Sequence, residues 1–379
     1  MFENLSHLTL QHYWWAIISL LGALLVFLLF VQGGQTLIYR LGKTDTERTL
    51  IVNILGRKWE FTFTTLVTFG GAFFAAFPLF YSTSFGGAYW VWMIILFAFI
   101  LQAVSYEFRT KPGNFLGKKT FEVFLFINGL VGTIFLGTAV GTFFTGSQFS
   151  VNDMNFSQWE TATHGLEAVL NVQNLALGLA LFFLSRTLAT LFIIQNVRHT
   201  EVIIRARRQL LQDALPFLVF FLTFTAMLLL KQGFAVNPET GEVFMQPYKY
   251  FRNMAEMPVV GILFLLGVVL VLLGIFRTAF CFEKCSDKGI WGAGIGTVLT
   301  VFALFLTAGY NHTAYYPSTF DLQDSLTIQN SSSSHYTLTA MSYVSLLVPF
   351  ILAYIFYAWR AITLKKIDQE ELEEEGHVY

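Results

Sequence analysis

Nine long apolar stretches, separated by short charged or polar segments, divide the whole sequence. A helix that crosses about 30 Å of hydrocarbon needs about 20 mostly apolar residues. Charged residues make up 12% of this chain, whereas an average soluble domain has about 25%. We therefore predict an all-α integral membrane protein with nine transmembrane helices, at approximately 14–39, 62–81, 87–106, 121–145, 167–197, 214–230, 258–280, 289–309 and 337–361.

The segments between the stretches are too short for a soluble domain. We predict a single polytopic membrane domain over residues 1–379, which ends in an acidic tail at 362–379. The second and third stretches share one charge-free run, in which residues 82–87 are expected to form the turn.

Lysine and arginine are concentrated in every second polar segment. The intervening segments hold none, except for three in residues 231–252. The positive-inside rule therefore places the amino terminus outside and the acidic tail in the cytoplasm. The basic segments are 40–58 with five lysine or arginine residues, 109–119 and 198–208 with four each, and 277–288 and 360–366 with three each.

The net charge of the chain is −1, which indicates no nucleic-acid partner.

Arg186 is a charged residue inside the fifth stretch, where a charge costs about 2.5 to 3.5 kcal/mol. A helix would place it about 18 Å from Arg198 at the inner end. Such an arginine can bind a carboxylate, a quinone carbonyl or a haem propionate. It can equally lie at a contact between subunits or extend toward a lipid headgroup, and both interpretations stay open.

Two amides, Gln32 and Gln35, flank two glycines inside the first stretch. Amides at this depth need hydrogen-bond partners. They can line a water path or bond to a cofactor, although hydrogen bonding between helices is their more common role.

Three carboxylates, Glu60, Glu107 and Glu122, are predicted to lie at the cytoplasmic edge. Acids clustered at a membrane surface can collect and relay protons, because partial desolvation raises their pKa. The alternative is ordinary salt bridges at the rim, which is favoured for Glu107 and Glu122. The basic neighbours for such bridges are Lys58, Arg109, Lys118 and Lys119.

All seven histidines are expected to lie in loops or tails. A transmembrane b-type haem normally needs an axial histidine on a helix, so we expect no such haem in this chain, although a methionine ligand remains open. Cys281 and Cys285 give only a weak metal signal, and we expect no metal site. The methionines within the stretches are Met93, Met227 and Met341.

Several short fragments follow one another over nearly the whole chain. They are Tyr13-Trp14-Trp15, residues 41–48, 53–60 and 70–78, Tyr106-Glu107-Phe108-Arg109, Thr307-Ala308-Gly309, Tyr316-Pro317-Ser318, residues 325–334 and Val348-Pro349. In this order they resemble subunit II of the cytochrome bd-type quinol oxidases. Each fragment is modest alone, but their order and spacing make the resemblance specific.

The resemblance implies a fold of two four-helix bundles plus one extra helix, in a bacterial cytoplasmic (inner) membrane. It implies a hetero-oligomer with a haem-bearing subunit I that oxidises quinol and reduces oxygen to water. Haems b and a chlorin-type haem are expected in that partner, and none is held firmly by this chain. The family also implies a proton route from the cytoplasm, contacts with membrane lipid and, in some members, a structural quinone.

This chain departs from the family pattern at three places. Family members typically have Asp-Gly-Phe-Asp where Gln32-Gly33-Gly34-Gln35 stands here, so two ionisable groups are replaced by amides. They typically have Trp-Asp-Gly-Asn where this chain has Trp59-Glu60-Phe61-Thr62, which keeps the acid. The family's Arg-Pro is Gln102-Ala103 here.

The leading hypothesis is a haem-free scaffold and proton-conducting subunit. Glu60 would take up protons, Gln32 and Gln35 would hold water, and Glu107 is a further candidate. Trp59 and Arg186 are candidates for positioning or quinone contact. One alternative is a purely structural subunit without a proton role. A less favoured one, from another class, is a secondary transporter, for which no convincing pair of matched broken helices is found.

Overall fold

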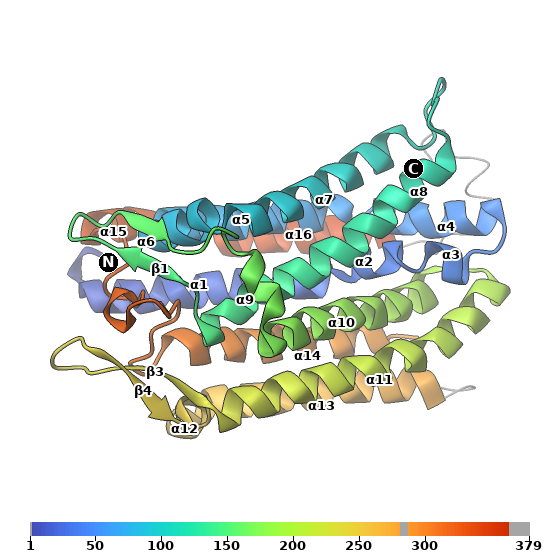
Figure 1. Cartoon of the computed structure of the whole chain (residues 1–379). Coiled ribbons are helices and arrows are strands. Elements are labelled where there is room, and N and C mark those ends of the chain that lie inside the picture. Colours follow the sequence, from blue (N-terminus) through green and yellow to red (C-terminus); the bar gives the residue numbers. More distant parts are fainter. Residues whose placement is uncertain (1, 281–286, 364–379) are drawn as a thin grey trace.

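The computed structural model describes residues 2–280 and 287–363, which form long helices that run side by side (Figure 1). Seven helical segments are long and apolar enough to cross a membrane, and two bent helix pairs raise the number to nine if each is one span. The prediction of a multi-pass helical membrane protein is thereby confirmed. Cys281, Cys285 and almost all of the acidic tail lie outside the described residues.

The helices follow one another through short connections. In the first part of the chain they are α1 (His7–Leu28), α2 (Phe30–Gln35), α3 (Ile38–Leu41), α4 (Asp45–Gly56), α5 (Trp59–Ala76), α6 (Pro78–Phe80), α7 (Tyr89–Phe108), α8 (Lys118–Ile127) and α9 (Thr133–Thr145). In the second part they are α10 (Val172–Asn196), α11 (Thr200–Leu230), α12 (Lys249–Glu256), α13 (Pro258–Phe280), α14 (Gly289–Gly309), α15 (His335–Ser345) and α16 (Val348–Thr363). Shorter helical turns are η1 (Phe2–Asn4), η2 (Tyr81–Gly87), η3 (Asn128–Gly132), η4 (Leu166–Leu170) and η5 (Leu322–Asp324).

Two short antiparallel hairpins form in the loops at one end of the bundle, in addition to the helices that the sequence predicted (Figure 1). Their pairing satisfies backbone N–H and C=O groups that no helix satisfies. The hairpins join β1 (Phe149–Val151) to β2 (Ser157–Trp159), and β3 (Gln232–Val236) to β4 (Val243–Pro247).

The second predicted stretch, 62–81, contains a break. Helix α5 ends at Ala76, and the backbone of Phe77 leaves the helical region with φ −134° and ψ 67°. Pro78 causes this break, because a proline disfavours helical backbone in the residue before it and lacks an N–H. The predicted turn at 82–87 is instead part of the π-helical turn η2.

The fifth predicted stretch begins at Glu167, whereas α10 begins at Val172. Glu167 lies in the turn η4 before that helix. Burial alone would raise the pKa of its carboxyl group, but the hydrogen bonds that it accepts outweigh burial and lower the pKa below its usual value. The donors are the side chains of Trp159, Thr161 and Thr163 and the backbone N–H of Gly165.

Helix α11 is much longer than the apolar stretch predicted at 214–230, because it starts at Thr200. Its first half carries three of the four basic residues of the segment 198–208, namely Arg205, Arg207 and Arg208. Hydropathy detects only the part of a helix that is apolar all round, so it did not detect this half.

Helix α10 is the most enclosed of the seven candidate spans, with 78% of its most apolar window buried. It packs against α2, α9 and α11. The approach of α2 is very close: a Cβ on Gly33 would lie 2.1 Å from the backbone of Ser185. Only glycine permits this contact, which brings the two amides of α2 into the interior of the protein.

The expectation that every histidine lies in a loop or tail is wrong for three of them. His12 lies within α1, and His7 and His335 begin α1 and α15. All three occupy helix ends, because these helices start before their apolar stretches.

Candidate functional site

Gln32 and Gln102 form a hydrogen-bonded pair of amides in the interior. The side-chain Nε2 of Gln32, on α2, donates to Oε1 of Gln102, on α7, over 2.8 Å. Both side chains have 0% exposure. Each amide keeps one atom without a hydrogen-bond partner among the described residues, Oε1 of Gln32 and Nε2 of Gln102. The pair therefore has unused donor and acceptor capacity.

Asn128 adds a third buried amide. It begins the π-helical turn η3, which packs against both α2 and α7. Asn128 has 0% exposure, and its Nδ2 and Oδ1 have no partner within the described part of the chain. Buried polar groups are normally paired with protein or with ordered water. Amides in this state are suited to holding water molecules.

Gln35 lies one turn further along α2 and links the amides to two aromatic residues. Its Nε2 donates to the hydroxyl of Tyr106 over 3.2 Å. The Tyr106 ring stacks on Trp59, with ring centroids 5.9 Å apart and an interplanar angle of 16°. Gln32, Gln35, Gln102, Tyr106 and Asn128 are called the amide column below.

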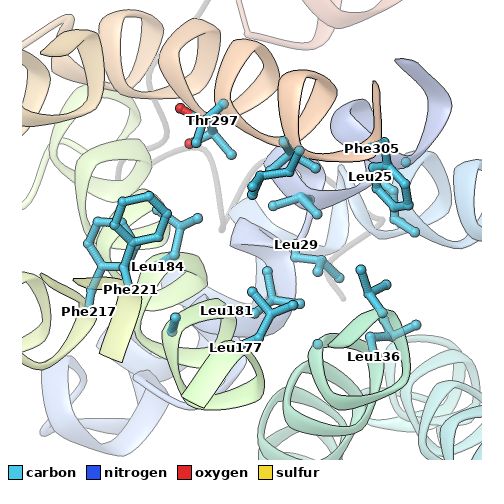
Figure 2. Close-up of a pocket in the computed structure, with 18 of the residues that line it drawn as sticks. Leu25, Leu29, Leu136, Leu177, Leu181, Leu184, Phe217, Phe221, Thr297 and Phe305 are labelled. Atoms are coloured by element: carbon cyan, nitrogen blue, oxygen red, sulfur yellow. The ribbon is translucent and has the colours of Figure 1, made fainter. Parts of the chain in front are cut away.

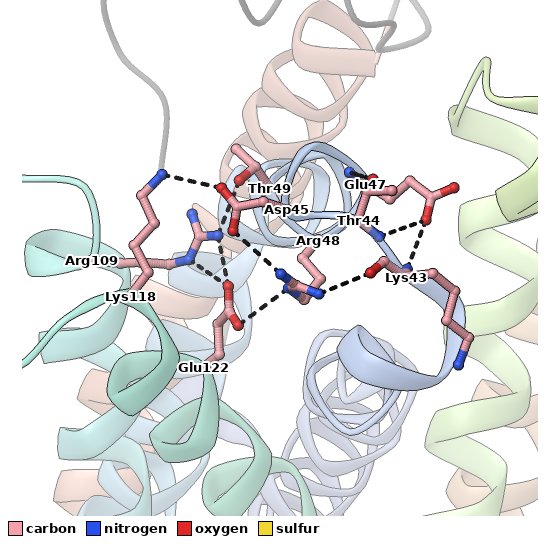
Figure 3. Close-up of polar contacts among 9 residues, drawn as sticks. All are labelled: Lys43, Thr44, Asp45, Glu47, Arg48, Thr49, Arg109, Lys118 and Glu122. Atoms are coloured by element: carbon pink, nitrogen blue, oxygen red, sulfur yellow. Dashed lines mark hydrogen bonds and ion pairs between the residues drawn. The ribbon is translucent and has the colours of Figure 1, made fainter.

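A buried ion-pair cluster lies at the end of the bundle that holds α4 and the start of α8 (Figure 3). The guanidinium of Arg109 donates to Oε1 of Glu122 over 2.8 and 3.2 Å. Arg48 approaches the other oxygen of Glu122 to 3.6 Å. The side chains of Arg109 and Glu122 are 0% and 1% exposed. Glu122 thus pairs with Arg109, as the rim alternative expected, but the pair is buried rather than at the rim.

The other two candidate acids lie on the outer faces of their helices. Glu60, in the first turn of α5, and Glu107, near the end of α7, are both exposed. Neither carboxylate has an ion pair or hydrogen bond with residues that the structure describes. The structure therefore joins Trp59 to Gln35 through Tyr106, while Glu60 and Glu107 point away from the amide column.

Arg186 binds a carboxylate of the same chain. Its Nε donates to Oδ1 of Asp213, on α11, over 2.8 Å, and its Nη1 donates to Oγ1 of Thr36 over 2.9 Å. Sequence reasoning did not single out Asp213, which directly precedes the apolar stretch 214–230. An acid at the edge of a basic segment was the only available signal.

An apolar cavity of about 110 Å³ lies between helices from both parts of the chain (Figure 2). Leucine and phenylalanine side chains dominate its lining. Two hydroxyls contribute, and both donate to a carbonyl of their own helix, Thr297 to Ala293 and Thr300 to Gly296. The cavity is suited to an apolar chain. Labelled lining residues in Figure 2 include Leu25, Leu29, Leu136, Leu181 and Phe221.

No group of three or more His, Cys, Asp or Glu residues within the described ranges is arranged to hold a metal ion. Gln102, Tyr106 and Asn128 are site residues that sequence reasoning did not assign. Gln102 was visible only as a departure from the family pattern, and Tyr106 only as part of a matching fragment.

Comparisons with known proteins agree with the resemblance in the sequence. The family described as "Cytochrome bd terminal oxidase subunit II" matches residues 10–362. "Cytochrome bd-I ubiquinol oxidase subunit 2" of Escherichia coli strain K12 is 28% identical, over 97% of this chain and 98% of that protein. "Cytochrome bd ubiquinol oxidase subunit 2" of Bacillus subtilis is 26% identical, over 96% and 98%.

A solved structure has a similar fold. A chain of the bd oxidase from Geobacillus thermodenitrificans superposes with a TM-score of 0.62, at 14% sequence identity, over 94% of this chain and 100% of that chain. At this identity the match supports the fold alone.

Proposed function

This chain belongs to the cytochrome bd terminal oxidase subunit II family and is a subunit of a quinol oxidase complex; from this premise we propose that it supports a haem-bearing subunit I and supplies a proton route from the cytoplasm. The b-type and chlorin-type haems of subunit I would carry electrons from quinol to oxygen. Reduction of oxygen to water consumes protons, which must cross part of the membrane to reach the site.

The amide column is the observation that best supports the proposed proton role. Gln32, Gln102 and Asn128 are fully buried, and each has at least one polar atom that no described residue of the chain binds. Ordered water would satisfy these atoms and would connect them. The amides cannot ionise, so their role is to hold the water through which protons pass.

Glu60 is proposed as the acid that takes up protons, with Glu107 as a second candidate. Trp59 holds the start of α5 by its stacking on Tyr106, which accepts the hydrogen bond from Gln35. Trp59 thereby fixes the start of α5 beside the amide column, while the Glu60 side chain points outward from it.

The exposed face of α5 is proposed to contact subunit I. Glu60, Thr64, Thr68 and Gly71 lie exposed at helical spacing on this face. Small and hydroxyl residues on a transmembrane face favour packing against another helix, and a carboxylate there needs a polar neighbour. Helix α16 extends the face, because every residue from 349 to 357 is exposed. In this arrangement Glu60 takes up protons at the contact between the subunits.

We further propose nine crossings of the bacterial inner membrane, arranged as two four-helix bundles and one extra helix. The basic segments would face the cytoplasm and the two hairpins would lie outside. Helices α5 and α16, each part of a bent pair, supply the two crossings beyond the seven unbroken spans.

The apolar cavity is proposed to hold an acyl or isoprenoid chain, such as the tail of a structural quinone. Its lining of leucine and phenylalanine fits such a chain. The hydroxyls of Thr297 and Thr300 are already engaged, so a quinone ring would have to lie outside this lining.

Substitution of Glu60 tests the proton role. Glu60→Gln keeps the size of the side chain and removes its ionisable group. In the purified complex we expect at least about a tenfold loss of quinol oxidase turnover, with normal haem content and assembly. Glu201→Gln, an equal change at an exposed position of α11, is the matched control and should have no effect. Unchanged turnover of Glu60→Gln in an intact complex would instead favour the purely structural alternative.

A further inference from the structure

Asp213 is a buried carboxylate at a position where the sequence indicated no site. It lies 13 residues after the start of α11, which is about 20 Å along the helix, and it is 2% exposed. Arg186 binds its Oδ1 over 2.8 Å. Its Oδ2 has no hydrogen-bond partner among the described residues. A buried carboxylate oxygen in this state needs a water molecule or a proton.

A short strip of polar side chains connects Asp213 with the surface. Arg40 is exposed, and its Nε donates to Oε1 of Gln209 over 3.0 Å. Its Nη2 donates to Oε1 of the exposed Gln212 over 3.1 Å. Gln209 is buried and lies one helical turn before Asp213. Polar groups therefore continue from the surface to the carboxylate.

On its other side, the Arg186–Asp213 pair contacts the segment that carries the two amides. Arg186 donates to Oγ1 of Thr36 over 2.9 Å, and Thr36 directly follows Gln35. The Thr36 hydroxyl in turn donates to the backbone carbonyl of Gly33 over 2.7 Å. The pair is thus in direct contact with the part of the chain in which Gln32 and Gln35 cannot ionise.

We propose that Asp213 is a proton-carrying residue of the oxidase and that Arg186 is its positioning residue, so that α11 supplies the ionisable group that α2 lacks. This inference rests on the proposed proton role of the subunit. A proton from water on the Gln209 side forms an O–H bond at Oδ2 and neutralises the carboxylate. The guanidinium charge of Arg186 is then uncompensated and favours release of the proton to water beside Thr36, which restores the neutral ion pair.

A purely structural pair is the competing explanation. Ion pairs of this kind hold neighbouring helices together, here α10 and α11. Such a role requires no free acceptor, whereas Oδ2 of Asp213 has no hydrogen-bond partner within residues 2–280 and 287–363. It also requires no polar strip from Arg40 to the carboxylate.

The test uses the purified complex in vesicles, with quinol oxidase turnover and proton uptake from the cytoplasmic side as readouts. Asp213→Asn should lower both at least about tenfold with normal haem content. Asp213→Glu, which restores an acid, should recover most of the loss. Arg186→Lys, which keeps the charge, should retain more turnover than Arg186→Gln. Glu201→Gln on the same helix is the control and should match the wild type.

A second variant is needed in case Asp213→Asn fails to fold, because that substitution leaves Arg186 as a buried charge without its partner. The double variant Arg186→Gln/Asp213→Asn replaces the whole pair by neutral amides and should also turn over slowly. Wild-type turnover of either variant in an intact complex would overturn the proposal. Loss of assembly in both variants would show that the Arg186–Asp213 pair serves to hold the helices together. That result would also overturn the proposal.

The Glu60→Gln variant separates this inference from the proposed function. If Glu60→Gln slows turnover and Asp213→Asn does not, the inference about Asp213 fails and the proton role of the subunit stands. If the reverse is observed, Asp213 carries protons and the uptake role of Glu60 fails. If neither substitution slows turnover in an intact complex, both fail.

Discussion

Gln32 and Gln102, which are 70 residues apart in the sequence, form a direct 2.8 Å hydrogen bond between two fully buried amides. These are two of the positions at which the chain departs from its family. The resemblance places an aspartate at the first and an arginine at the second. The structure shows that the two departures are in contact, and the resemblance implies that family members have opposite charges where this chain has a neutral pair. Loss of only one charge would leave the other buried and unpaired.

This relationship predicts a charge-restoring double variant. Gln32→Asp alone should destabilise the complex by about 3 to 5 kcal/mol, because it buries a carboxylate without a partner. Gln102→Arg alone should be destabilising for the same reason. The double variant Gln32→Asp/Gln102→Arg should recover most of the stability, since the two charges then pair. Retention of assembled complex after heating measures each effect, and a single variant as stable as the wild type would contradict the pairing.

The close contact of α2 with α10 predicts a large effect of one methyl group. Gly33→Ala would place a Cβ 2.1 Å from the backbone of Ser185, so the helices must separate. We expect the complex to lose about 1 to 3 kcal/mol of stability. Turnover should also fall, because the amides move. Gly292→Ala on α14 is the matched control, since the nearest atom to its Cβ is 3.7 Å away. Equal thermal stability of the two variants would argue against the contact.

Hydropathy in the sequence was enough to predict the fold class and the approximate positions of the spans. Hydropathy did not reveal that the second predicted span is divided at Pro78, because α5 and the residues after it are equally apolar. It also missed the first half of α11, whose charges hide a helix that continues the apolar stretch 214–230.

The site was predicted only in part. Gln32 and Gln35 stand out in a sequence as amides inside an apolar stretch, and both are buried. Their partners Gln102 and Tyr106 could not be predicted, because the contact joins segments far apart in the chain. The outward direction of Glu60 was also invisible, since an apolar helix shows no periodicity that reveals which face is covered.

A further prediction concerns the first residue of α12. Lys249 is 5% exposed, and its Nζ donates to the backbone oxygen of Asn311 over 2.7 Å. Burial lowers the pKa of Lys249 to about 8, whereas an unfolded lysine has a pKa of about 10.4. The unfolded state therefore binds more protons between these two values, and the stability contributed by Lys249 should rise with pH across that window.

Thermal unfolding of the complex between pH 7 and 10 checks this sign. The stability of the wild type relative to Lys249→Met should increase as the pH rises above about 8. Lys231→Met removes a lysine that is exposed and should show no such trend. A relative stability that falls with pH would mean that folding raises the pKa of Lys249 instead of lowering it.

We propose that this chain is the haem-free subunit of a quinol oxidase. The most direct test is a reduced-minus-oxidised spectrum of the complex purified through a tag on this chain from its own membranes, beside the chain expressed alone. We expect b-type and chlorin-type haem bands in the complex and none in the lone chain. A native complex without haem bands, or a lone chain that shows them, would rule out this assignment.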